Sequence, residues 1–181
     1  MVQYIIIEKT LQGGFVLERK ACSFSGHRQI YHIHNESLPK KLNEVVDMLI
    51  EAGFTHFLSG GAIGFDLLAA ECVLEKRKTN PSIRLSMVLP CRDQASRWPA
   101  ATRRKYEAIL AAADEVNYIT EKYDSFCMHA RNRALVDNSD VLICYLVRTS
   151  SGTGYTRNYA EEKGRRIVNL ADLIGSEEND G

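Results

Sequence analysis

The sequence lacks both a long apolar run and an excess of charge of one sign. No stretch approaches the roughly 20 apolar residues that a membrane-spanning helix needs, and the first residues lack a signal-peptide pattern. The 23 basic and 23 acidic residues balance, whereas a duplex-DNA binder usually carries a basic excess. We therefore expect a soluble, cytoplasmic protein without a membrane partner. A small-molecule partner is favoured, and a nucleic-acid partner is possible but disfavoured.

The sequence also lacks the cysteine patterns of disulfide frameworks and zinc sites. Its five cysteines are dispersed, odd in number and free of any Cys-x-x-Cys pair, which predicts reduced and mostly buried thiols. Cys127 and His129 form one close pair and His32 and His34 another, but a structural zinc site needs four ligands. We expect no bound metal and no required cofactor.

Strand-like and helix-like segments alternate along most of the chain, which predicts an α/β fold: a Rossmann-like open, mostly parallel sheet with helices on both faces. Strands are expected at 21–24, 55–58, 83–89 (ending at Pro90), 116–119, 141–147 and 167–170. Helices are expected at 38–52, after Gly64 to about 78, around 106–113, at 127–136 and after 150–156 to about 163. We assign 1–20 to an N-terminal β-hairpin or edge extension, 21–175 to the Rossmann-like domain and 176–181 to a frayed tail.

Four loops rich in glycine, hydroxyl and basic groups each follow an expected strand, at 25–28, 59–66, 90–98 and 150–156. Because crossovers in parallel sheets are right-handed, such loops gather at the carboxyl edge, where open sheets bind ligands. We expect a phosphate-bearing, nucleotide-type small molecule there. The candidate ligand-binding residues are Ser25, Gly26, His27, Arg28, Ser59, Gly60, Gly61, Gly64, Asp66, Arg92, Gln94, Trp98, Arg131, Asn132, Ser151, Gly152, Thr153 and Gly154.

The segments SGGAIGFD (59–66) and SSGTGYT (150–156) are the candidate phosphate cradles. Each opens an expected helix, where free N–H groups and the positive end of the helix dipole form an anion site. The first segment matches neither the GxGxxG fingerprint nor the P-loop. The alternative for both is a plain strand-to-helix turn whose glycines or hydroxyls serve only the local geometry.

Single side chains allow two interpretations each. Arg28 can grip a phosphate through two hydrogen bonds. Asp66 can hold a ribose hydroxyl, or serve as a first-turn carboxylate favoured by the helix dipole. Trp98 can stack on a base beside the charge of Arg92, or pack the loop onto the core. Arg131, the one candidate catalytic residue, can point into the site with Asn132, or lie on a solvated helical face.

Taken together, SGHR (25–28), SGGAIGFDLLAAE (59–71), Leu-Pro followed by Gln94 and Trp98, and RNRALVDNSDVLICY (131–145) resemble the YpsA-like family. That family belongs to the SLOG superfamily, with DNA-processing protein A and the Lonely Guy proteins. The resemblance covers roughly residues 21–170. It implies a Rossmann-like fold, a nucleotide-derived ligand and a homodimer or larger homo-oligomer.

Two segments resemble particular superfamily members. SGGAIGFDLLAA is similar to the glycine-containing loop of the DNA-processing proteins, and MHARNRA (128–134) is similar to the Met-His-Glu-Arg-Lys-Ala segment of Lonely Guy phosphoribohydrolases. The sequence departs from the latter enzymes where they carry glutamate. Ala130 replaces one, and Arg157 or Asn158 stands near the position of the catalytic one. N-glycosidic cleavage then lacks its expected carboxylate.

Three functions therefore remain open. The favoured one is a nucleotide binder that acts as a sensor or regulator rather than an enzyme. The second is a phosphoribohydrolase that releases the base from a nucleoside 5′-monophosphate and depends on Arg131. The third is a single-stranded nucleic-acid binder similar to DNA-processing protein A, to which the basic run 103–105 would contribute.

Overall fold

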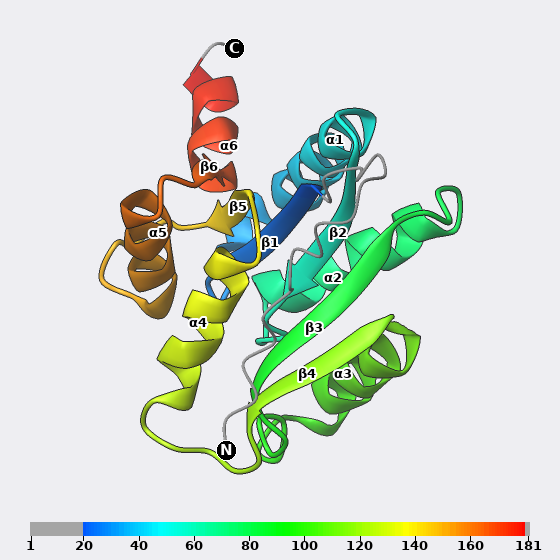
Figure 1. The fold of residues 1–181 in the computed structure, drawn as a ribbon. Coiled ribbons are helices and arrows are strands. Elements are labelled where there is room, and N and C mark those ends of the chain that lie inside the picture. Colours follow the sequence, from blue (N-terminus) through cyan, green and yellow to red (C-terminus); the bar gives the residue numbers. More distant parts are fainter. Residues whose placement is uncertain (1–19, 180–181) are drawn as a thin grey trace.

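Six parallel strands form one open sheet in the order β4-β3-β2-β1-β5-β6 (Figure 1). The chain runs outward from β1 to β4 and then returns to place β5 on the other side of β1, so the strand order reverses between β1 and β5. The strands are β1 (Lys20–Gly26), β2 (Phe54–Ser59), β3 (Arg84–Cys91), β4 (Glu115–Thr120), β5 (Val141–Tyr145) and β6 (Arg166–Asn169).

The computed structural model describes residues 20–179, with side chains as far as Gly175. The N-terminal hairpin that we expect at 1–20 lies outside the described residues, apart from Lys20, which begins β1. In the described part of the chain, no helix is both long and apolar enough to cross a membrane. All five cysteines are free and buried, as the sequence predicts.

Helices cover both faces of the sheet. They are α1 (Ser37–Glu51), α2 (Phe65–Arg77), α3 (Ala100–Ala112), α4 (Cys127–Asp137), α5 (Gly152–Glu162) and α6 (Leu170–Asn179), with a 3-10 turn, η1 (His32–His34), before α1. One layer contains α1, α2, α3 and α6, in which α1 contacts α2 and α6, and α2 contacts α3. The other contains α4 and α5, which pack against each other (Figure 1). This arrangement confirms the Rossmann-like α/β fold.

The apolar pattern of the sequence explains which segments lie at the centre. Every residue of β5 and five consecutive residues of β1 are buried, as expected for strands covered on both faces. In α1, the buried residues recur at helical spacing and form one face toward the core, from Leu38 to Leu49. Phe24 of β1 lies 6.1 Å from Phe57 and 6.4 Å from Phe65 between ring centroids, which joins β1, β2 and α2.

Two strand ends differ from the sequence prediction. We expect β3 to stop at Pro90, but it continues to Cys91. There β3 pairs only with β4, since its register with β2 ends at Met87. A proline is tolerated where a strand has one free edge, and the Pro90 carbonyl accepts a hydrogen bond from Thr120 Oγ1 at 3.0 Å. We expect β5 to reach Val147, but it ends at Tyr145. The N–H groups of Leu146 and Val147 donate to the side chains of Asn169 and His27, and not to the backbone of a neighbouring strand.

The C-terminal part contains a helix that we do not predict from the sequence. We expect a last strand through Leu170, but β6 ends at Asn169 and α6 begins at Leu170. Leu170 and Ile174 are buried and join the main core, where α6 packs on α1 and β5. The backbone of α6 continues to Asn179, into the segment that we assigned to a tail.

Candidate functional site

The loop after β1 is bonded to the loops of both neighbouring strands at the carboxyl edge. Phe65 N, at the start of α2, donates to the His27 carbonyl at 3.2 Å. His27 Nε2 accepts from the N–H groups of Val147 and Arg148, at 2.9 and 3.1 Å. The loop 25–28 thus lies between the loop after β2 and the loop after β5. The segments that carry Arg28, Gly61 and Gly152 meet at one edge, as the sequence analysis requires.

Glycine is needed at position 64, where the loop after β1 touches the loop after β2. Its φ is +88°, which L-residues rarely adopt, and a Cβ there would overlap the carbonyl oxygens of His27 and Arg28. The glycine therefore permits the close packing of the β1 end on the start of α2, in agreement with the geometric interpretation of this position.

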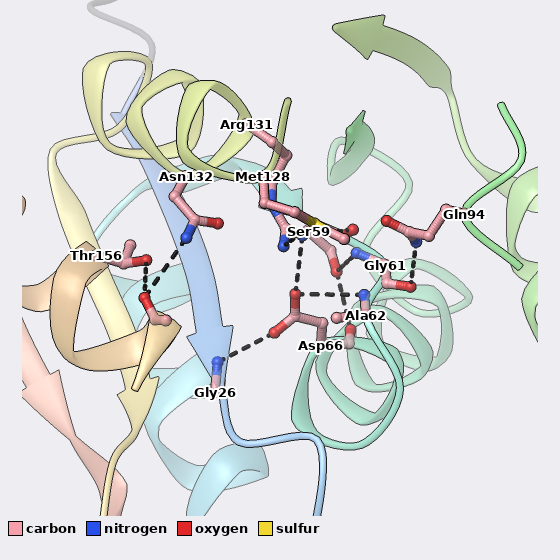
Figure 2. Close-up of polar contacts among 12 residues, drawn as sticks. Gly26, Ser59, Gly61, Ala62, Asp66, Gln94, Met128, Arg131, Asn132 and Thr156 are labelled. Carbon is pink, nitrogen blue, oxygen red and sulfur yellow. Dashed lines mark hydrogen bonds and ion pairs between the residues drawn. The ribbon is translucent and has the colours of Figure 1, made fainter. Parts of the chain in front are cut away.

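Asp66 is a structural carboxylate in the first turn of α2. It is 3% exposed. Its Oδ1 accepts from Gly26 N at 3.1 Å, and its Oδ2 accepts from Ala62 N and Arg131 Nη1, both at 3.4 Å (Figure 2). Burial raises the pKa of this carboxyl, while the charge of Arg131 and the two N–H donors oppose that rise. Both oxygens are thus bonded within the protein, which joins the end of β1 to the glycine loop after β2.

Arg131 reaches this cluster from α4, on the other face of the sheet. It is 7% exposed, so the interpretation as a solvated face is wrong. Its Nη1 donates to the Gly60 carbonyl at 2.7 Å and contacts Asp66 (Figure 2). A Cβ on Gly60 would overlap the guanidinium. The fold therefore uses Arg131 and a glycine together to bring α4 against the end of β2.

Asn132, the next residue of α4, contacts the second glycine loop. Its Nδ2 donates to the Gly152 carbonyl at 3.5 Å, and Thr156 Oγ1 donates to the same oxygen at 2.9 Å (Figure 2). Two adjacent residues of α4 therefore hold the loops that follow β2 and β5, the strands on either side of β1. The alternative of a solvated face is wrong for Asn132 too, since it is buried.

The start of α5 has the local geometry of an anion site. Ser151 caps the helix by accepting from Gly154 N at 3.1 Å, and the first intrahelical bond runs from Tyr155 N to the Ser151 carbonyl. The N–H groups of Gly152 and Thr153 precede that bond, in the turn where helix N–H groups lack intrahelical acceptors. A Cβ on Gly152 would meet no atom within 4 Å, so packing does not require glycine at this position.

Two exposed arginines lie beside these loops. Arg28 follows β1, and the Arg148 guanidinium, after β5, lies 5.6 Å from the centre of the Tyr31 ring. Neither forms an ion pair with an acidic side chain of the described residues. Sequence reasoning missed Arg148 and Tyr31. The signal for Arg148 was its place directly after a buried strand, the same signal that singled out Arg28.

The three candidates in the loop after β3 have different partners, and only Gln94 contacts a glycine loop. Gln94 lies on the glycine loop, where its Nε2 donates to the Gly61 carbonyl at 2.9 Å (Figure 2). Arg92 instead pairs with Glu121 at 2.7 Å, on the β4 side. Trp98 packs edge-on against Tyr106 at 5.1 Å between ring centroids, which agrees with the core-packing interpretation.

The two serine candidates at the ends of β1 and β2 are buried. Ser59 Oγ donates to the Asp66 carbonyl at 2.9 Å and accepts from Gly61 N at 3.2 Å, so it shapes the glycine loop from within. Ser25 lies within β1, opposite Cys144 of β5. Two open hollows of the described surface lie away from the glycine loops. One, of about 560 Å³, lies at η1 and the start of α1, and the other, of about 330 Å³, includes Arg84 and Asp114.

Comparisons with known proteins agree on one family and one fold. The sequence model of the YpsA family, described as the YspA SLOG family, matches residues 23–172. The UPF0398 protein BH1768 of Halalkalibacterium halodurans is 38% identical over 119 residues, which cover 65% of this chain and 60% of the relative. A UPF0398 protein of Bacillus cereus strain G9842 is 30% identical over 135 residues, covering 67% of this chain and 73% of the relative. The chain thus spans between three fifths and three quarters of these relatives.

Solved structures of DNA-processing protein A share the fold at low sequence identity. The protein from Streptococcus pneumoniae aligns with a TM-score of 0.61 and 21% identity, over 82% of this chain and 49% of that one. The protein from Helicobacter pylori aligns with a TM-score of 0.61 and 20% identity, over 88% of this chain and 73% of that one. These likenesses support the sheet topology described above.

Replacing Arg131 should unfold the protein more readily, whatever its role in ligand binding. Arg131→Ala leaves the buried Asp66 carboxylate without its counter-charge and the Gly60 carbonyl without its donor, and breaking a buried pair costs about 3–5 kcal/mol. Urea denaturation followed by circular dichroism measures this loss. Arg133→Ala, on the exposed side of the same helix, should lower the free energy of unfolding far less, because its hydrogen bond to Tyr155 lies at the surface. Equal losses in the two variants would contradict the structural role.

Acidification should break the hydrogen bonds by which His27 holds the loop between β5 and α5. Burial, and then the charge of Arg148, lower the pKa of His27, and a protonated ring cannot accept from Val147 N and Arg148 N. In the unfolded chain, His27 binds a proton near pH 6.5, whereas in the folded chain it binds one only at lower pH. The free energy of unfolding therefore falls as the pH drops below about 6.5.

The variant His27→Gln removes this titration but keeps an acceptor oxygen. Between pH 7.5 and 5.5 its free energy of unfolding should fall less than that of the wild type, as measured by urea denaturation at each pH. An NMR titration should place the pKa of His27 below its usual value. The same pH slope in both proteins would refute the linkage.

Proposed function

Because the chain belongs to the YpsA family of SLOG proteins, we propose that it binds a phosphate-bearing, nucleotide-type small molecule at the carboxyl edge of β1, β2 and β5. Such a ligand is a nucleotide, or a compound like ADP-ribose or NAD. The observation that carries the proposal is the pair Arg131 and Asn132, which holds two glycine loops at the point where the strand order reverses. Open α/β sheets bind ligands at such a point.

The start of α5 is the proposed phosphate position. The N–H groups of Gly152 and Thr153 and the helix dipole favour a negative charge there, and the exposed Arg28 and Arg148 follow the two adjoining strands. Gly152 supports this placement, because the fold leaves open space where its side chain would be. A phosphate oxygen can approach the backbone at that point, as it could not beside a larger residue.

A sensor or regulator is favoured over a hydrolase by the state of the carboxylates. Asp66, the buried one at the edge, has both oxygens bonded within the protein. Glu161 of α5 pairs with Arg157 at 2.8 Å, away from the helix start. Cleavage of an N-glycosidic bond requires a carboxylate placed against the sugar, and neither of these supplies one. The proposed binding needs no further cofactor.

A second candidate is binding of single-stranded nucleic acid. The Helicobacter pylori structure that shares this fold describes a single-stranded DNA binding mode of that protein. In this chain, Tyr123 and Phe126 are 62% and 78% exposed in the connection between β4 and α4. Exposed aromatic rings can stack on bases. The balanced charge favours the small-molecule ligand over this alternative.

Thermal denaturation with AMP, NAD, ADP-ribose and ribose 5-phosphate, each at millimolar concentration, tests the main proposal. At about ten times its Kd, a ligand adds roughly 1.4 kcal/mol of stability, which should raise the Tm by about 3–6 °C. Gly152→Ala should keep the unliganded Tm, because an added methyl meets open space, yet weaken binding about tenfold by blocking the backbone.

The matched control is Gly175→Ala in α6, where an added Cβ also meets no atom; it should bind like the wild type. No Tm rise with any of the four compounds, or wild-type affinity in Gly152→Ala, would reject the proposed phosphate position.

The second candidate predicts a different result with a 15-nucleotide single-stranded DNA. Fluorescence anisotropy should then detect binding that weakens with added salt, and the double variant Tyr123→Ala, Phe126→Ala should reduce it by about tenfold or more, since each stacked base contributes about 1–3 kcal/mol. Absence of binding at low salt would eliminate this candidate and leave the main proposal untouched.

A further inference from the structure

Three buried polar atoms around the first glycine loop have no hydrogen-bond partner among the described residues. They are Gln94 Oε1, Tyr106 Oη and Arg131 Nε. The two other atoms of this kind belong to Ser37 and Arg165, in separate parts of the molecule. The three thus form a group of their own at the carboxyl ends of β2 and β3.

The three side chains come from three different elements and lie around the same dipeptide, Gly60–Gly61. Arg131 of α4 donates to the Gly60 carbonyl, and Gln94 of the loop after β3 donates to the Gly61 carbonyl (Figure 2). The Tyr106 ring, from α3, lies 3.3 Å from the position that a Cβ of Gly61 would take. The dipeptide thus lies between one side chain from each helix layer, and each of these side chains has an unsatisfied polar atom.

The energetics argue against a purely structural role for these atoms. A buried polar group without a partner costs about 1–3 kcal/mol, and native proteins contain few of them. Tyr106 is 4% exposed and packs its ring against Trp98, a contact that phenylalanine would make without the unsatisfied hydroxyl. Arg131 already has its charge balanced by Asp66, so its Nε adds a donor and no net charge.

The chemistry of the three atoms defines what they can recognise. Arg131 Nε donates, Gln94 Oε1 accepts, and the Tyr106 hydroxyl does either. A neutral heterocycle with donors and acceptors along one edge complements such a set. A phosphate does not, because its oxygens would meet the Gln94 carbonyl. The dipeptide Gly60–Gly61 is itself buried, so a flat ring reaches these atoms only when a covering side chain moves.

We propose that Gln94, Tyr106 and Arg131 recognise the base of a nucleotide at the carboxyl ends of β2 and β3. This inference rests on the proposed function, whose phosphate position lies at the start of α5. Gln94 is the side chain that yields as the base enters. It is half-buried, it lies in a loop whose neighbours Asp93 and Ser96 are exposed, and one hydrogen bond to Gly61 holds it.

The test compares nucleotides with a probe that has no base. Isothermal titration calorimetry measures the Kd of AMP, GMP, CMP, UMP and ribose 5-phosphate for the wild type, Tyr106→Phe and Gln94→Met. Tyr106→Phe should be at least as stable as the wild type, since the hydroxyl bonds no described residue. It should bind the preferred nucleotide about three- to tenfold more weakly and ribose 5-phosphate with unchanged Kd.

Gln94→Met should reduce the discrimination among the four bases. The control Tyr159→Phe, which removes a hydroxyl that donates to Asp137, should leave every Kd unchanged. Equal effects of Tyr106→Phe on nucleotide and ribose 5-phosphate, or no effect on either, overturn the base subsite while the proposed function stands. Failure of the wild type to bind any of the five compounds overturns both.

Discussion

The buried ion pair between Arg131 and Asp66 holds the carboxyl edge of this protein together. The two residues come from helices on opposite faces of the sheet, and each also bonds backbone at a strand end, Gly60 for the arginine and Gly26 for the aspartate. Desolvation of two charges is expensive, and the attraction between them offsets it only when further hydrogen bonds complete the geometry. Here the loop backbone supplies those bonds, so the pair and the loop conformation depend on each other.

This dependence separates a framework from a recognition surface. Asp66, Nη1 of Arg131 and Ser59 bond inward and fix the first glycine loop, whereas Gly152, Arg28 and Arg148 remain open to solvent. At the proposed phosphate position, the ligand would then meet preformed backbone donors. Little ordering accompanies binding there, which favours affinity. The burial of an arginine that resembles an enzyme's residue is thereby explained by the architecture of the edge.

The sequence predicts the alternation of strands and helices and the convergence of glycine loops, because both follow from apolar periodicity and the handedness of crossovers. The contacts within the site could not be predicted in this way. Asp66 and Arg131 are 65 residues apart, and their meeting depends on where α4 returns over the sheet. Arg92 was a reasonable candidate by position, but Glu121 lies within reach once β4 is in place. The prediction that β3 ends at Pro90 is wrong, because a strand tolerates proline at a free edge. Whether β3 has a free edge there is a property of the assembled sheet.

The central position of β1 has a consequence for how the chain acquires its structure. Ala21 N donates to the Asp140 side chain, 119 positions later, and β5 then pairs along the same strand. During synthesis, β1 can pair with β2 early, but its other edge stays uncovered until β5 has left the ribosome. Contacts of such long sequence separation slow folding, and an uncovered strand edge invites association with other chains. The nascent protein is therefore most exposed to aggregation in the interval between the emergence of β2 and that of β5.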